Sequence, residues 1–428
     1  MKIHIKNGRV IDPASHTDKV QDVFVAGGKV VALGTAPDNF LANRVLDAKG
    51  LVVCPGLVDI SARLREPGYE YRATLVSEMS AAVAGGVTSL ACPPDTDPVL
   101  DEPGLVEMLT YRAKTMNKAR VFPRGALTVG LKGEHITEMA ELSEAGCVAF
   151  SQADTPIVNT EVLYHALKYA ATFDFPVWLQ PRDAFVGRKG VAHDGEVATR
   201  LGLVPIPVAS ETIALATILQ LARDTGARVH IARISSAAGL ELVREARAQG
   251  LAVTCDVSIN HLHLCDTDIG YFNPHCHFVP PLRSQADREA LRQGLADGSV
   301  DVLCSDHTPV DDDGKQVPFA EAEPGATGLE LLLPLTLKWG MEMGLPLTKT
   351  LSRITADAAR VLGVDHGCLA VGATADLCLF DPDAWTLVSR ETLLSQGKNT
   401  PFLGLELPGK VRYTLVGGQV VFEAKPGA

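Results

Sequence analysis

The chain has 428 residues, of which 46% are hydrophobic and 21% charged, and its formal net charge at pH 7 is −12. This length and apolar content are enough for one large α/β barrel and a smaller domain. The negative charge argues against non-specific nucleic-acid binding. No apolar run reaches the roughly 20 residues of a membrane span, and the N-terminus shows no signal-peptide pattern. We therefore expect a cytoplasmic protein that contacts neither nucleic acid nor membrane and keeps its nine cysteines reduced.

Short β-type runs occupy the two ends of the chain. Residues 1–54 alternate such runs with tight turns, and residues 373–381 and 411–424 show the same strand and Gly-Gly turn chemistry. These segments should pack together as one small β-sandwich domain. Its N-terminal part is expected at residues 1–54 and its C-terminal part at residues 366–428.

Between the two ends, apolar strands alternate with alanine- and leucine-rich helices. The apolar run at residues 51–58 predicts the first strand of a barrel, and residues 76–86 predict a helix that leads into a strand at 87–93. A second helix is expected at residues 211–226. This alternation favours an α/β fold with a parallel (β/α)8 TIM-type barrel over residues 55–365.

One segment is rich in Asp, Pro and Gly. It spans residues 310–326. We expect it to be disordered.

The sequence DISARLREPG at residues 59–68 follows the first predicted barrel strand. Ser61 and Arg63 are two residues apart, so they should project on the same face of the strand. A hydroxyl is a poor zinc ligand, and a guanidinium has no lone pair to offer and carries a positive charge. This stretch therefore has the setting of a metal motif without metal-binding side chains.

The chain resembles the dihydroorotases of the amidohydrolase superfamily, specifically the longer bacterial class. Separated segments carry the resemblance in the family's order, and they cover nearly the whole chain. They are IKNGRVIDPA at 5–14, LREPG at 64–68, GEVATRLGL at 195–203, PPLRSQADREAL at 280–291, SDHTP at 305–309 and KNTPFLGLELPGKV at 398–411.

Carried over residue by residue, the resemblance implies that most metal ligands of the family are missing. Histidines of the family's D-x-H-x-H motif correspond to Ser61 and Arg63, and the carboxylate of its F-S-D-D-G-x-P segment falls in FSQADTP. Only Asp306 keeps a side chain of the expected type. The metal-site positions are held here by Ser61, Arg63, Gln152, Gln180, Arg233 and Asp306.

The substrate contacts that the resemblance implies are altered as well. Arg65 matches the arginine that holds the substrate carboxylate. Asp95 stands where the family has an asparagine, and an acidic group would repel an anionic substrate at short range. Val279 replaces a polar group. The resemblance thus implies a site that has lost its catalytic function.

Inactive members of this family associate with aspartate carbamoyltransferase in pyrimidine biosynthesis and hold it in its active assembly. The resemblance therefore implies a structural subunit with no cofactor, present as a homodimer inside a larger complex. The physical basis is that a barrel is stabilised by its interior and helices, while chemistry depends on loops at one face.

A second interpretation is an enzyme with metal-independent activity, or a binder of a small anion in the old pocket. Arg63, Arg65 and Arg233 would supply positive charge, whereas Asp95 and Asp306 would oppose it. The metal-free alternative would use Asp306 with the next residue in the chain, His307.

A buried carboxylate needs a partner or must take up a proton. We therefore expect Arg63 or Arg233 to lie within about 4 Å of Asp306.

Two further motifs are not expected to bind metal: the histidine pairs are predicted to be structural or solvated, and the acidic run a solvated turn. The paired histidines at 261–263 and 275–277 lack a partner acid. The acidic run at 311–314 lacks the spaced acceptors of a calcium loop.

Overall fold

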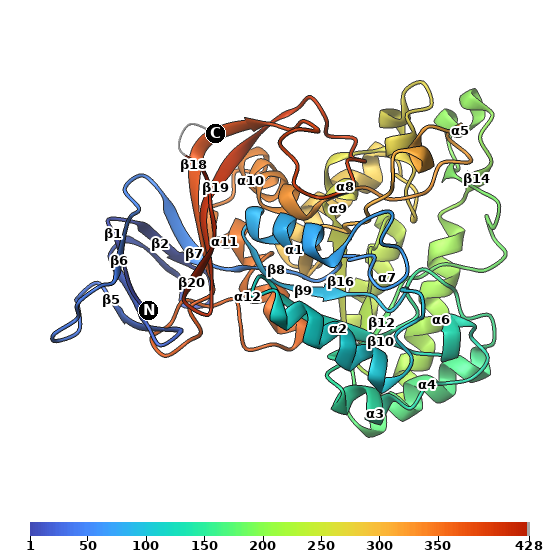
Figure 1. The fold of residues 1–428 in the computed structure, drawn as a ribbon. Helices are drawn as coiled ribbons and strands as arrows, with labels where there is room; N and C mark the ends of the chain where they lie inside the picture. The colour runs from blue at the N-terminus through green and yellow to red at the C-terminus, as the bar shows by residue number, and fades with distance from the viewer. Residues whose placement is uncertain (426–428) are drawn as a thin grey trace.

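The computed structural model describes residues 1–425 of the chain, and eight parallel strands form its centre (Figure 1). The strands are hydrogen-bonded in the order β17-β16-β15-β12-β11-β10-β9-β8. Beyond the ends of β8 and β17, a parallel bridge between Ala62 and His307 closes the ring. The predicted barrel is confirmed. Its strands are β8 (Leu57–Asp59), β9 (Val87–Cys92), β10 (Arg120–Ala126), β11 (Ala149–Ser151), β12 (Val177–Leu179), β15 (Val229–Ile231), β16 (Val253–Ser258) and β17 (Val302–Cys304).

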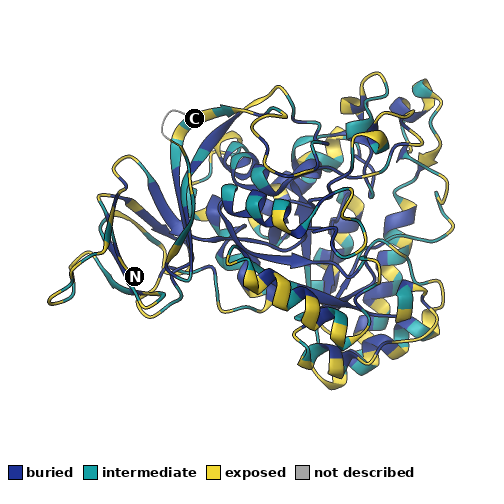
Figure 2. Cartoon of the chain, viewed as in Figure 1, coloured by how far each residue is buried: buried dark blue, intermediate teal, exposed yellow. Residues whose placement is uncertain are grey.

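Helices cover the outside of the barrel, with buried faces toward the strands and exposed faces outward (Figure 2). Helix α1 begins at a capping box in which Thr74 and Ser77 satisfy each other's backbone N–H groups. The helices expected at 76–86 and 211–226 are confirmed as α1 and α6. The helices are α1 (Leu75–Ala84), α2 (Pro103–Thr115), α3 (Met139–Glu144), α4 (Thr160–Thr172), α5 (Glu196–Leu201), α6 (Ala209–Thr225), α7 (Ala237–Ala248), α8 (Ile259–His263), α9 (Gln285–Asp297), α10 (Leu332–Glu342), α11 (Leu347–Ser352) and α12 (Ala356–Leu362).

The two ends of the chain form the predicted β-sandwich beside the barrel (Figure 1). One sheet has the order β5-β4-β1-β6 and the other the order β20-β19-β18-β7-β2-β3, so the second sheet joins both ends of the chain. Buried residues such as Ile3, Val25 and Leu379 fill the core of the β-sandwich. The strands are β1 (Lys2–Lys6), β2 (Arg9–Asp12), β3 (Thr17–Val20), β4 (Val23–Ala26), β5 (Lys29–Leu33), β6 (Arg44–Asp47), β7 (Val52–Pro55), β18 (Leu377–Leu387), β19 (Glu406–Val416) and β20 (Gln419–Glu423). A separate short pair, β13 (Ala192–His193) and β14 (Pro205–Ile206), lies in a loop of the barrel.

The apolar run at residues 51–58 is not one barrel strand, so this part of the sequence prediction was wrong. Its first half is β7, which pairs with β18 in the sandwich, and only its end belongs to barrel strand β8. Gly56 separates the two strands, and its backbone N–H donates to the carbonyl of Asp376 at 2.8 Å. Ser61 and Arg63 lie just beyond the C-terminal end of β8, where the sequence placed them.

The loop at residues 310–326 is folded, contrary to the expectation of disorder. Phe319 and Lys315 are buried, and the Lys315 ammonium donates to the carbonyl of Pro274 at 3.0 Å. Ion pairs from Asp312 to Arg390 and from Glu323 to Arg72 fix its flanks. One large aromatic anchor and these charge pairs thus order a segment whose composition predicts flexibility. No helix within residues 1–425 is long and apolar enough to cross a membrane.

Candidate functional site

Five charged side chains meet at the C-terminal ends of the barrel strands. Arg63 follows β8, Asp95 follows β9, Asp154 follows β11, Arg233 follows β15 and Asp306 follows β17. We call this group the ion cluster. It lies at the end of the barrel where enzymes of this architecture carry their active sites.

Two guanidiniums hold the ion cluster together. Arg63 donates to Asp95 through Nε and to Asp154 through Nη2, both at 2.7 Å, and its Nη1 lies 3.8 Å from Asp306 Oδ1. Arg233 donates to Asp306 Oδ1 at 3.1 Å and also pairs with Asp154. The sequence predicted that Arg63 or Arg233 would contact Asp306, and this is confirmed for both arginines.

Most of the ion cluster is withdrawn from water. The side chains of Arg63, Arg233 and Asp306 are 7%, 6% and 4% exposed, whereas those of Asp95 and Asp154 keep 26% and 33%. Buried charges are costly unless they are paired and hydrogen-bonded, so each guanidinium stabilises carboxylates that would otherwise take up protons.

The backbone around the ion cluster is held in a rarely occupied conformation. Ala153, Arg233 and Asp306 have φ angles of 49°, 55° and 49°, and the substrate-site position Arg65 has 62°. Such left-handed residues cost energy when they are not glycine and concentrate at functional sites. These four left-handed residues therefore mark this end of the barrel as a candidate functional site.

The carboxylates of the ion cluster differ in their proton affinity. Burial raises the pKa of Asp306 to about 6, because desolvation outweighs the attraction of Arg233 and Arg63. Burial also acts to raise the pKa of Asp154, but Arg233 and Arg63 both contact it directly and hold its pKa well below the usual range. Asp306 is therefore the carboxyl of this pair that takes up a proton first.

The side chains of the site do not fit a divalent metal. Zinc needs several converging imidazole, thiolate or carboxylate donors, and guanidiniums stand between the carboxylates here. Gln180 carries a buried amide oxygen without a hydrogen-bond partner, and Gln152 accepts from Thr128 at 3.0 Å. Within residues 1–425, no group of three or more His, Cys, Asp or Glu side chains is arranged to hold a metal ion.

The predicted substrate-site residues are occupied by internal contacts. Asp95 pairs with Arg63, and the backbone carbonyl of Val279 accepts from Arg233 at 3.4 Å. Arg65 donates through Nε to the carbonyl of Pro309 at 3.0 Å. Burial, followed by the charge of Arg63, lowers the pKa of Arg65 to about 10.

Histidines near the site are engaged elsewhere. His307 donates through Nε2 to Glu78 at 2.7 Å and accepts through Nδ1 from the N–H of Gly328 at 3.0 Å, so it is not a proton-transfer partner of Asp306. His230 contacts Asp256 at 2.8 Å inside the barrel. His261 and His263 lie on α8, where their Nε2 atoms contact backbone carbonyls.

Two residues of the site were missed by the sequence analysis. Asp154 bridges both guanidiniums. In the sequence it is recognisable only as an acidic residue that directly follows the Gln152-Ala153 pair. Arg124 lies on β10 and is 4% exposed. Its burial is unusual for an arginine, and the sequence around it gave no sign of it.

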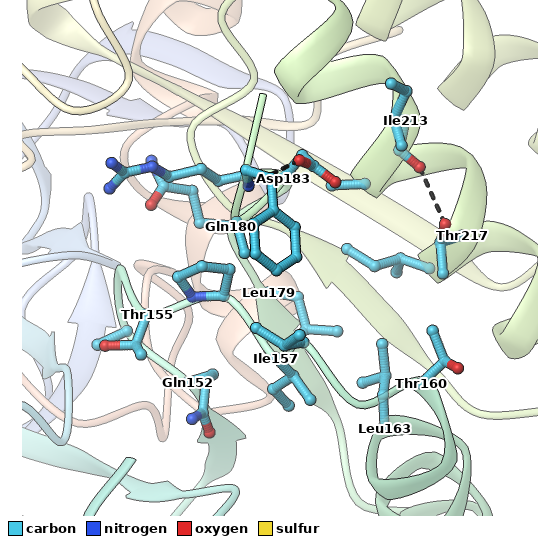
Figure 3. A pocket seen from close by; sticks show the side chains of 18 residues that line it. Gln152, Thr155, Ile157, Thr160, Leu163, Leu179, Gln180, Asp183, Ile213 and Thr217 are labelled. Atoms are coloured by element: carbon cyan, nitrogen blue, oxygen red, sulfur yellow. Dashed lines mark hydrogen bonds between the residues drawn. The ribbon is translucent and has the colours of Figure 1, made fainter. Parts of the chain in front are cut away.

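A cavity of about 130 Å³ lies beside the ion cluster, between the loops after β11 and β12 and helices α4 and α6 (Figure 3). Its wall is largely apolar and includes Ile157, Leu163 and Ile213. Gln152 and Gln180 border it, but none of the five ion-cluster residues does. This space is therefore separate from the charged centre of the barrel mouth.

The barrel, the β-sandwich and the position of the site define an amidohydrolase architecture, and comparisons with known proteins agree. Residues 183–422 match the model of the amidohydrolase family, and residues 50–238 match the dihydro-orotase-like model. The L-hydantoinase of Arthrobacter aurescens has the same fold, with a TM-score of 0.88 and 25% identity over 98% of this chain and 96% of that one.

Curated relatives narrow the assignment. A "dihydroorotase-like protein" of Pseudomonas aeruginosa is 47% identical over 99% of this chain and 100% of its own length. A "dihydroorotase" of Geobacter sp. strain M21 is 42% identical over 99% of this chain and 100% of its own length. The chain belongs to the dihydroorotase-like branch of the amidohydrolase family.

Removing both guanidiniums should destabilise the fold. The variant Arg63→Ala/Arg233→Ala leaves Asp306 buried without a counter-charge, and breaking a buried pair costs roughly 3–5 kcal/mol. The matched control is Arg228→Ala/Arg360→Ala, because these side chains are 50% and 62% exposed. Thermal unfolding should show a large loss for the first variant and almost none for the control. Equal losses would mean that the ion cluster does not support the barrel mouth.

Stability should also depend on the protonation of Asp306. Its folded pKa of about 6 lies above the ordinary value of 3.8, so its contribution to stability is complete below about pH 4 and is lost as the pH rises through 6. Asp306→Asn removes this titration and imitates the protonated carboxyl. The unfolding temperature of the native chain minus that of this variant should decrease as the pH rises from 4 to 7. A difference independent of pH would contradict the assignment.

Proposed function

We propose that the chain is a non-catalytic dihydroorotase homologue that serves as a structural subunit of aspartate carbamoyltransferase in de novo pyrimidine biosynthesis. The observation that carries the proposal is the ion cluster. Arg63 and Arg233 engage the carboxylates of the barrel mouth, at positions where the family resemblance implies zinc ligands. A site filled in this way has no activated water for hydrolysing a cyclic amide.

The rest of the molecule supports a structural role. A single bridge beyond β8 and β17 links the two edges of the barrel sheet, and the barrel with its helices and the sandwich bury continuous apolar cores. Because the outer surface of a barrel is independent of its loops, it can keep a partner after the site has lost its chemistry. On this proposal the chain is cytoplasmic and forms a homodimer within a larger complex, as the family resemblance implies.

The geometry gives less support to the alternative, a metal-independent enzyme or small-anion binder that uses Arg63, Arg65 and Arg233. Two of these arginines are engaged by carboxylates. His307, the proposed partner of Asp306 in metal-free chemistry, donates to Glu78 instead.

The purified protein should bind no stoichiometric zinc and show no dihydroorotase activity in either direction. The reason is the combination of Ser61, Arg63, Gln180 and Arg233 in place of ligands. Metal analysis and assays of both directions check this, with the Geobacter relative named dihydroorotase as a parallel control. Close to one or two zinc ions per chain, together with activity lost on chelation, would refute the inactive assignment.

The chain should also form a stable complex with aspartate carbamoyltransferase, burying at least the ~1,200 Å² of a specific interface. Size-exclusion chromatography of the two purified proteins at micromolar concentration, followed by a carbamoyltransferase assay, tests this. We expect one co-eluting peak and altered activity or assembly size of the carbamoyltransferase. Two independent peaks and unchanged activity would remove the structural role.

A further inference from the structure

The side-chain amides of Gln152 and Gln180 border the cavity drawn in Figure 3, across from Ile213 and Thr217 of α6. Gln152 is only 1% exposed, and its Nε2 donor finds no acceptor among residues 1–425. The Oε1 atom of Gln180 is likewise buried, and no donor in this part of the chain reaches it. Buried polar groups are normally hydrogen-bonded, so an unpaired donor and an unpaired acceptor beside one cavity indicate a bound water or ligand.

The barrel places these two amides next to each other. Gln152 directly follows β11 and Gln180 directly follows β12, and the two strands are paired neighbours with Ser151 opposite Trp178. Neighbouring strands run about 4.8 Å apart, a span that one small polar group can bridge. Both unpaired atoms are covered in this conformation, so contact with a ligand requires the amide planes to turn. The last torsion of a glutamine side chain is broad, and this turn therefore costs little.

The rest of the cavity wall suits an apolar ring. Leu163 and Leu179 line it, and so do Val158, Phe185 and Ile213, which are exposed. The volume of about 130 Å³ is close to the roughly 150 Å³ of an apolar protein cavity that holds one benzene molecule. The exposed apolar side chains mark the side from which such a ring enters.

The charged side chains of the wall favour a neutral ligand. They are Arg182 and Asp183, which have opposite signs. One oxygen of Asp183, Oδ1, accepts from the backbone N–H groups of Phe185 and Val186 at 2.9 and 2.7 Å, so this carboxylate is engaged by its own loop. The wall therefore has no net charge with which to attract an ion.

We propose that this cavity binds a small neutral aromatic carboxamide, with its ring among the apolar side chains and its amide against Gln152 and Gln180. The carboxamide oxygen accepts from Gln152 Nε2, and the carboxamide nitrogen donates to Gln180 Oε1, so both unpaired groups are satisfied by one ligand. A ring without the amide leaves these groups unpaired, and an amide without the ring leaves the apolar wall in contact with water. The site does not depend on the proposed structural role, so either can fail without the other.

Ligand-observed NMR titration of the full chain with benzamide tests the proposal. We expect a dissociation constant of about 1 mM or lower, as suits a ligand of this size. Toluene carries only the ring and acetamide only the amide, and each should bind at least about fivefold more weakly than benzamide. The absence of benzamide binding up to about 10 mM, or an equal affinity for toluene or acetamide, would overturn the proposal and leave the amides to water only.

Two variants locate the binding. Ala214 lines the cavity from α6, so Ala214→Phe should fill the space and abolish benzamide binding. Ala216→Phe is the matched control, because Ala216 lies on the same helix but is exposed and does not line the cavity. Gln180→Leu should weaken benzamide binding about fivefold and leave toluene binding unchanged. Benzamide binding that persists in Ala214→Phe would refute the site. If that variant does not fold, equal benzamide affinity of Gln180→Leu and the native chain would refute it.

Discussion

The barrel mouth depends on one constraint, the need to balance three carboxylates that gather where β9, β11 and β17 end. Asp306 is 4% exposed, and Asp154 and Asp95 lie beside it. Where an active relative is expected to use divalent cations, Arg63 and Arg233 supply fixed positive charge from the chain itself. Their forked guanidiniums reach two or three carboxylates each, so the loops after β8, β9, β11, β15 and β17 are tied into one unit.

The ion cluster is not the only support of these loops. Glu78 on α1 accepts from His307 at 2.7 Å, from the Ser395 hydroxyl at 2.6 Å and from the N–H of Gln396 at 3.0 Å. This buried network connects the loop after β17 to the first barrel helix and to the segment that precedes β19. His307, the residue after Asp306, is thus held by hydrogen bonds that do not involve the ion cluster, and these bonds help to fix the position of Asp306. A change of residues at the centre of the mouth can therefore leave the surrounding backbone in place.

The sequence predicted the architecture and much of the site, and the failures have physical causes. Strand and helix alternation indicated the barrel, and convergence of strand ends indicated that Arg63 or Arg233 would meet Asp306. The run at 51–58 was misassigned because two consecutive buried strands in different sheets share one apolar pattern. Asp154 was missed because sequence spacing does not report that Ala153 adopts a φ of 49°, which turns the chain at this point. Burial of Arg124 depends on tertiary packing and leaves no local signal.

Fixed charges and bound metals differ in what they allow a site to do. A metal ion can exchange, and it activates water because open coordination positions remain. A guanidinium has neither property, and its charge persists at any cellular pH because its pKa stays far above neutrality. Replacing metal by arginine therefore gives up hydrolytic chemistry but makes the structure of the mouth independent of metal supply. Under the structural role proposed above, that exchange is favourable, because the barrel would keep one conformation whether or not metal is available.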